Sequence, residues 1–162
     1  MNSKSFLLIL IILVTLLVVL YFFKPAHSDG SDWREYLGGP DRNHYSILTQ
    51  IDSSNVGRLQ IAWEYHTGDS GQVQCNPLVV DGRLYGVTAQ AEPFALDAVT
   101  GKELWRIANN NTNNVIMRGL SFWEDGDDQR IFYSRDSWLH AVDALSGEAV
   151  MAFGDSGRVS LK

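Results

Sequence analysis

One pattern of eleven residues occurs twice in this chain, 46 positions apart, and it constrains the fold more than any other feature. The first copy, ALDAVTGKELW, begins at Ala95, and the second, AVDALSGEAVM, begins at Ala141. Each copy has the composition of a strand, a turn and the start of a second strand. The strands before the two copies also match, as RLYGVT at Arg83 and RIFYSR at Arg130. A period in the forties made of strands is typical of β-propeller blades, and two unrelated hairpins are the alternative.

The residues of the repeat have a physical role in such a fold. The carboxylate of Asp97 can accept hydrogen bonds from the amides of the turn, and Gly101 can take the left-handed backbone conformation that the turn requires. Trp105 follows at the start of the outer strand, where its indole can wedge between neighbouring blades and bury about 200 Å². An earlier partial copy ends at Trp63, while Met151 takes the place of the tryptophan in the second copy.

Further strands are predicted by alternation and by turn signals. The pair Asp81-Gly82 between two apolar runs is a strong hairpin signal, because both central residues of the turn must accept positive φ. Residues 59–69 alternate well enough to predict a strand. The acidic stretch at 124–130 does not have the spacing of a calcium-binding loop, so we interpret it as a solvated turn.

The amino terminus indicates a membrane segment. Residues 6–23 form an apolar run of eighteen residues in which Thr15 is the only polar side chain. As a helix this run would be about 27 Å long, close to the hydrocarbon thickness of a bilayer. We therefore expect one transmembrane helix in residues 1–24, as an anchor or uncleaved signal, then a linker at 25–32 and exported blades in 33–162. A cleaved signal peptide is the alternative, although its apolar core is usually shorter.

Composition narrows the classes of partner. The net charge of −6 argues against nucleic acid as a ligand. Aromatic residues make up 11% of the chain and there are 14 glycines, which suits many short strands joined by turns. Cys75 is the only cysteine, so neither an internal disulfide nor a multi-cysteine metal site can form. We expect it to be a small buried residue.

The pattern Ala-x-Asp-x-x-Thr-Gly-Lys-x-x-Trp resembles the tryptophan-docking repeat of dehydrogenases that depend on pyrroloquinoline quinone (PQQ). Further stretches are similar to that family in the same order: DWREYLGG, QCNPLVVDGRLYGVT, MRGLSFW and FGDSGRVSL. The resemblance implies an all-β, eight-bladed propeller with PQQ and a calcium ion in its central cavity, of which this chain would hold about two four-stranded blades. It also implies oxidation of alcohols or sugars in the periplasm, with a quinone or a cytochrome as the electron acceptor.

The resemblance carries three residues of this chain into the cofactor site. Arg118, in MRGLSFW, is similar to the family arginine that pairs with a carboxylate of PQQ, which a planar guanidinium can bind with two hydrogen bonds. Gln74 falls where many relatives have a glutamate beside the cofactor, and an amide can still donate and accept hydrogen bonds there. Ser134, or Tyr133 beside it, lies near a family position that offers a hydroxyl to the quinone.

The resemblance assigns no catalytic residue and no metal ligand to this chain, because the family's catalytic aspartate and calcium ligands lie further along the polypeptide. We therefore expect the amino-terminal fragment of a membrane-anchored PQQ-dependent dehydrogenase, truncated and inactive alone. The alternative is a cofactor-free propeller with the same repeats, acting as an assembly scaffold in the cell envelope. A scaffold needs no arginine directed into its central cavity, so Arg118 distinguishes the two functions.

Overall fold

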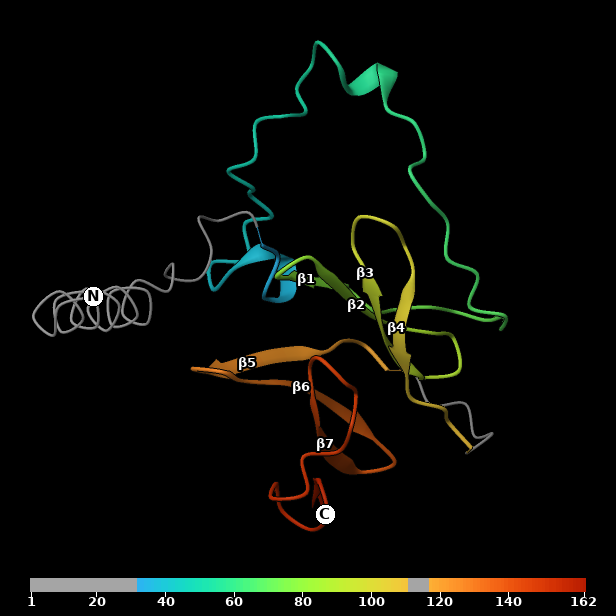
Figure 1. Ribbon diagram of the computed structural model, residues 1–162, viewed down its shortest axis with the longest axis vertical. Coiled ribbons are helices and arrows are strands. Elements are labelled where there is room, and N and C mark those ends of the chain that lie inside the picture. Colours follow the sequence, from blue (N-terminus) through green and yellow to red (C-terminus); the bar gives the residue numbers. More distant parts are fainter. Residues whose placement is uncertain (1–31, 111–116) are drawn as a thin grey trace, which may run out of the picture.

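The computed structural model describes residues 32–110 and 117–162, and within them the fold is all-β apart from two short 3-10 helices (Figure 1). The first sheet has the order β1-β2-β3-β4 and the second has the order β5-β6-β7-β8, both antiparallel. The predicted all-β class and the two four-stranded sheets are therefore confirmed.

The elements of the described residues follow the chain in a simple order. The 3-10 helices are η1 (Tyr36–Gly38) and η2 (Val56–Arg58). The first sheet contains β1 (Leu78–Val80), β2 (Arg83–Val87), β3 (Pro93–Asp97) and β4 (Glu103–Arg106). The second contains β5 (Ser121–Asp125), β6 (Asp128–Arg135), β7 (Trp138–Asp143) and β8 (Arg158–Ser160). The predicted membrane anchor at residues 1–24 lies outside the described part, in which no helix is long and apolar enough to span a bilayer.

The hairpin between β1 and β2 has the predicted turn. Val80 pairs with Arg83, so the loop consists of two residues. Asp81 has φ of 48° and Gly82 has φ of 73°. Positive φ at both positions is the conformation that matches the right-handed twist of the flanking strands, and Asp-Gly is among the few pairs that accept it.

The turns of the two repeats are built in the same way. Oδ1 of Asp97 accepts hydrogen bonds from the backbone N–H and the hydroxyl of Thr100, both at 2.7 Å. Oδ1 of Asp143 accepts the same two bonds from Ser146, both at 2.8 Å. Gly101 closes the first turn with φ of 71° and donates its N–H to the carbonyl of Asp97. The predicted roles of the aspartate and the glycine are confirmed.

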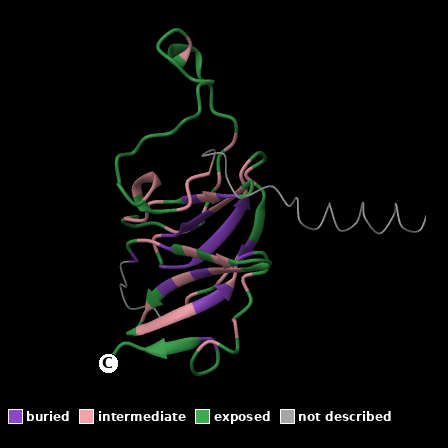
Figure 2. Ribbon diagram, turned by 90° about the vertical axis from the view of Figure 1, so that its left-hand side faces the viewer, coloured by how far each residue is buried: buried purple, intermediate pink, exposed green. Residues whose placement is uncertain are grey.

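Buried residues of both sheets form a hydrophobic core within the described part of the chain. Figure 2 shows the two sheets stacked, with buried residues concentrated in their strands. Trp105 of β4 is only 8% exposed, and its Nε1 donates to the carbonyl of Ala144 beyond β7, at 3.0 Å. Its ring also packs against Tyr85 of β2. The indole therefore joins the first sheet to the second, as the repeat predicts.

Two predicted outer strands differ from expectation. Residues 59–69 belong to no sheet, although burial alternates from residue 62 to residue 69, because the described part of the chain places no strand beside them. In the second sheet the strand after the repeat turn is interrupted: Ala149 makes an isolated bridge to Val142, and the chain then leaves the sheet before β8 returns to pair with β7. Met151, which replaces the tryptophan, is 66% exposed within this excursion.

Candidate functional site

The segments that lead into β1 and β5 lie side by side. Asn76, two residues before β1, forms a parallel bridge with Gly119, two residues before β5. Paired strands lie about 4.8 Å apart. Gln74 is two residues from this bridge on one segment and Arg118 is one residue from it on the other. The structure thus brings two of the predicted cofactor residues, 44 positions apart in sequence, to the same end of the first strand of each sheet.

The side chains at this end of the sheets are suited to an anion. Arg118 is exposed, and among the described residues it makes no ion pair or hydrogen bond. A guanidinium without a protein carboxylate can bind a ligand carboxylate through two parallel N–H···O bonds. Gln74, on the adjacent segment, is half-buried and carries both a donor and an acceptor. Among the described residues, Arg118 is therefore available to an anionic ligand.

The third predicted residue lies at the same end of the second sheet. Ser134 is the last residue but one of β6 and is exposed. Ser121 of β5 pairs with Phe132, so Ser134 lies two positions beyond that pair, at the end of β5 that Arg118 precedes. Neighbouring side chains of a strand point to opposite faces. Since Tyr133 is buried between the sheets, the hydroxyl of Ser134 points away from the first sheet.

Tyr133, the alternative hydroxyl, belongs to the core between the sheets. It is 4% exposed and its ring stacks on His140 of β7, with 4.8 Å between ring centroids. Burial raises the pKa of the Tyr133 hydroxyl. Of the two candidates, Ser134 is therefore the one accessible to a ligand.

Cys75 lies between Gln74 and the bridge but has no reactive character. The thiol packs against the hydrophobic core, although it is half-buried rather than fully buried as expected, and it donates to the carbonyl of Asn76 at 3.4 Å. Burial raises its pKa to about 11. The thiolate is thus scarce at neutral pH, and we assign Cys75 to packing.

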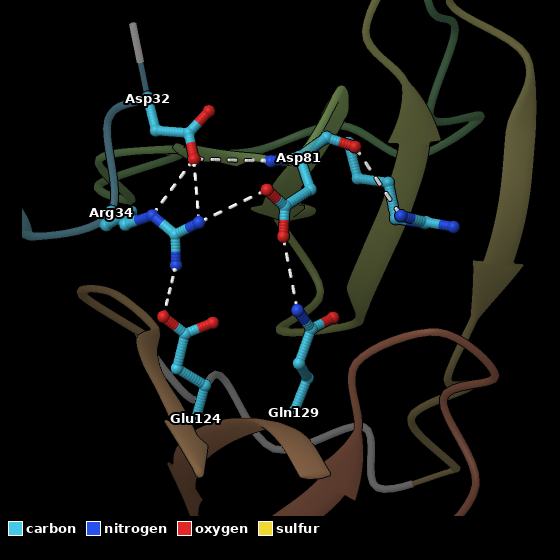
Figure 3. A network of polar contacts seen from close by, with 6 residues as sticks. Asp32, Arg34, Asp81, Glu124 and Gln129 are labelled. Carbon is cyan, nitrogen blue, oxygen red and sulfur yellow. Dashed lines mark hydrogen bonds and ion pairs between the residues drawn. The ribbon is translucent and has the colours of Figure 1, made fainter. Parts of the chain in front are cut away.

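A second polar cluster, which no sequence motif predicted, lies at the opposite end of β1 (Figure 3). Arg34 donates to Asp32 and to Glu124, both at 2.9 Å, and to Asp81 at 3.2 Å. Gln129 of β6 also donates to Asp81, at 3.1 Å. Burial alone would lower the pKa of Arg34, but the hydrogen bond to Glu124 and the surrounding carboxylates raise it. This network fastens the chain before β1 to the hairpin tips of both sheets.

Metal chemistry has no support among the described residues. They contain no group of three or more His, Cys, Asp or Glu side chains that could hold a metal ion. The acidic stretch at 124–130 forms the β5–β6 hairpin, in which Asp125 pairs with Asp128. Asp97 and Asp143 are engaged in the repeat turns.

Comparison with known proteins identifies relatives over most of the chain. The sequence profile of the family "PQQ: Glucose/ethanol/alcohol dehydrogenase, beta-propeller domain" matches residues 33–162. The chain is 34% identical over 127 residues to "Alcohol dehydrogenase (quinone), dehydrogenase subunit" of Gluconobacter oxydans (strain 621H), covering 74% of this chain and 16% of that protein. It is 30% identical over 156 residues to the quinoprotein glucose dehydrogenase of Escherichia coli (strain K12), covering 81% and 20%. The chain thus spans about a fifth or less of the length of these relatives.

Solved structures agree with this similarity. A quinohemoprotein alcohol dehydrogenase from Pseudomonas putida HK5 superposes with a TM-score of 0.69 at 26% identity, covering 82% of this chain and 19% of that one. A europium-containing methanol dehydrogenase superposes with a TM-score of 0.61 at 28% identity, covering 74% and 22%. The two sheets therefore resemble blades of quinoprotein dehydrogenases.

Proposed function

Since this chain belongs to the β-propeller family of PQQ glucose, ethanol and alcohol dehydrogenases, we propose that it supplies two blades and part of the cofactor site of such a dehydrogenase. The substrates would be alcohols or sugars, oxidised at a CH–OH group. A quinone or a cytochrome would accept the electrons. By itself the chain would bind cofactor weakly and would not turn over substrate.

The observation that carries this proposal is the bridge between Asn76 and Gly119. It places Arg118 and Gln74 on adjacent segments at one end of the sheets, although 44 positions separate them in sequence. A propeller that served only as a scaffold would have no need of an exposed arginine without a protein partner at this place. The arrangement supports a site for an anionic ligand.

The residues of this chain would bind and orient the cofactor. Arg118 would pair with one carboxylate of PQQ, and its fork of N–H donors would fix the plane of that carboxylate. Gln74 would donate or accept one further hydrogen bond, and Ser134 would offer a hydroxyl from β6. When bound, PQQ supplies the acceptor for the two electrons of alcohol oxidation. Calcium is a prediction from the resemblance only, and we derive no step through it.

Membrane attachment is a separate part of the proposal. It rests on the apolar run at residues 6–23, which lies outside the described residues. A helix there would anchor the blades to a membrane and place them in the periplasm.

The experiment is a titration of the purified chain with PQQ, followed by quenching of tryptophan fluorescence. We expect Arg118→Ala to weaken binding about 10- to 100-fold, because a hydrogen bond to a charged group contributes about 1.5–3 kcal/mol. Arg118→Lys should restore part of the loss, since a point charge lacks the fork geometry. Arg58, in η2, is also exposed, so Arg58→Ala is the matched control and should bind like the unaltered chain.

Two results would contradict the proposal. Equal dissociation constants for the Arg118→Ala and Arg58→Ala variants would remove Arg118 from the site. Absence of specific PQQ binding in every variant would favour the alternative function, a cofactor-free scaffold of the cell envelope.

A further inference from the structure

A group of basic and aromatic side chains lies on the face of the second sheet that carries Tyr133. Tyr133 of β6 pairs with His140 of β7, and His140 pairs with Arg158 of β8. Residues that lie opposite each other in an antiparallel ladder share a face. Because Tyr133 belongs to the core formed by both sheets, this face is directed toward the first sheet and is opposite to the face of Ser134.

The next row of the ladder adds a second arginine to the same face. Arg135 of β6 pairs with Trp138 of β7. Each of them lies two positions along its strand from a member of the first row, and residues two apart in a strand point to the same side. The face therefore carries five side chains that we call the basic cluster: Tyr133, Arg135, Trp138, His140 and Arg158.

Both arginines of the basic cluster lie over aromatic rings. Cζ of Arg135 is 5.5 Å from the ring centroid of Tyr133, and Cζ of Arg158 is 4.4 Å from the ring centroid of Trp138. A guanidinium interacts with a ring through its flat face, so the N–H donors along its edge are not used by the ring. The rings thus support the two guanidiniums and leave their hydrogen-bond donors for another partner.

Neither arginine has a carboxylate partner in the described part of the chain. No ion pair between described residues includes Arg135 or Arg158, and Nη1 of Arg135 is buried without a hydrogen-bond partner. Arg130, near the other end of β6, also lies over a ring, that of Trp123, but it donates to the carboxylate of Asp128. A buried N–H without an acceptor is costly and calls for a water molecule or an ion.

The imidazole of His140 shows that the two guanidiniums act on one place. Burial and the positive charges of Arg135 and Arg158 lower the pKa of His140, while a hydrogen bond with the Arg135 backbone and the carboxylate of Asp136 act in the opposite direction. Asp136 lies in the turn between β6 and β7. Positive charges that act on one half-buried group repel each other as well, and an anion among them would relieve that repulsion.

We propose that the basic cluster binds an oxyanion with two negative charges, carried either by a phosphate group or by two carboxylates. Arg135 and Arg158 would donate to it from the free edges of their guanidiniums, each of which can form two parallel N–H···O bonds. Because the arginines come from β6 and β8, with β7 between them, the bound anion would fasten the short outer strand β8 to the sheet. This site is separate from the proposed cofactor site, since Ser134 lies on the other face of β6.

Calorimetric titration of the full chain tests the proposal with inorganic phosphate and malonate as probes, in a mildly alkaline chloride buffer in which both are dianions. Tighter binding of phosphate would identify a phosphate group as the ligand, and tighter binding of malonate a dicarboxylate. We expect Arg135→Gln and Arg158→Gln each to weaken binding about 10- to 100-fold, because each removes hydrogen bonds to a charged group. Arg130→Gln is the matched control and should bind like the unaltered chain, since Arg130 already has a carboxylate partner.

Hydrogen exchange on the unaltered chain gives a second measurement that does not depend on the folding of a variant. With the tighter-binding probe at saturation, the amides of β8, Arg158–Ser160, should exchange several-fold more slowly, because the anion would hold this strand to β6. The amides of β1, Leu78–Val80, should not change, which separates a local effect from a general one.

Three results would overturn the proposal: no binding of either probe, equal affinities of the Arg135→Gln, Arg158→Gln and Arg130→Gln variants, or exchange in β8 that the bound probe leaves unchanged. Titration of the Arg118→Ala variant distinguishes this site from the proposed cofactor site. If that variant loses phosphate or malonate while Arg135→Gln does not, the anion occupies the cofactor site and the basic cluster is not an anion site. PQQ is absent from all of these measurements, so failure of this proposal leaves the proposed function untouched.

Discussion

The contact between the two sheets depends on Trp105, and replacing it by alanine tests the blade architecture directly. The indole is 8% exposed, packs against Tyr85 with 6.0 Å between ring centroids, and donates to the carbonyl of Ala144 at 3.0 Å. Removing a buried tryptophan in this way costs about 3–5 kcal/mol through lost apolar burial and the cavity left behind. That is a large part of the stability of a small domain, which is about 5–15 kcal/mol in total.

The assay is urea unfolding of the chain, followed by far-ultraviolet circular dichroism. With the slope usual for small proteins, Trp105→Ala should lower the urea midpoint by more than about 1 M. Trp105→Phe keeps an aromatic ring but loses the hydrogen bond and some volume, so we expect a smaller loss of about 1–2 kcal/mol. This milder variant keeps the comparison measurable if the alanine variant does not fold.

Trp123 supplies the matched control, because it is 42% exposed at the edge of the second sheet. Trp123→Ala should cost no more than about 1 kcal/mol, in keeping with a largely exposed position. If Trp105→Ala and Trp123→Ala lower stability equally, or if Trp105→Ala stays within about 0.5 kcal/mol of the unaltered chain, the indole does not join the two sheets and the blade reasoning fails.

Three further measurements test other parts of the structure. Gly101→Ala should destabilise the chain by about 1–3 kcal/mol more than Gly82→Ala, because both have positive φ but only the first would push a methyl group into an indole, and equal losses would contradict the docking geometry. The side-chain and backbone hydrogen bonds from Thr100 lower the pKa of Asp97, so the stability it contributes is complete above its unfolded pKa and is lost as the pH falls through its folded pKa. The Asp97→Asn variant should therefore lose less stability than the unaltered chain on acidification from about pH 5 to pH 2, and parallel urea-midpoint profiles would speak against this. Deleting residues 1–24 should move the protein from the membrane fraction to the soluble fraction, and recovery of both forms in the soluble fraction without processing would show that the anchor prediction is wrong.

The sequence alone was sufficient for features whose causes lie within a few residues. The turn from Asp97 to Gly101 is specified by a carboxylate that accepts hydrogen bonds two and three residues ahead and by a glycine that takes positive φ. The Asp81-Gly82 hairpin follows from the same local rule. Because such interactions join residues that are close in the chain, they can be inferred from the sequence. The repetition of the turn motif predicted two four-stranded blades.

Other features were decided only by the tertiary structure. The alternation of residues 59–69 predicts a strand, but a ladder needs a neighbour, and no local pattern can show whether one is present. Arg34 donates a hydrogen bond to Glu124, which lies 90 positions later in the sequence, and neither residue type predicts this pairing. In the same way, sequence motifs identified Gln74 and Arg118 as separate candidates. Only the bridge between Asn76 and Gly119 shows that their segments lie at one end of the sheets. Neighbouring residues determine local hydrogen bonds and backbone conformation, whereas contacts between segments far apart in the sequence form only when the sheets pack.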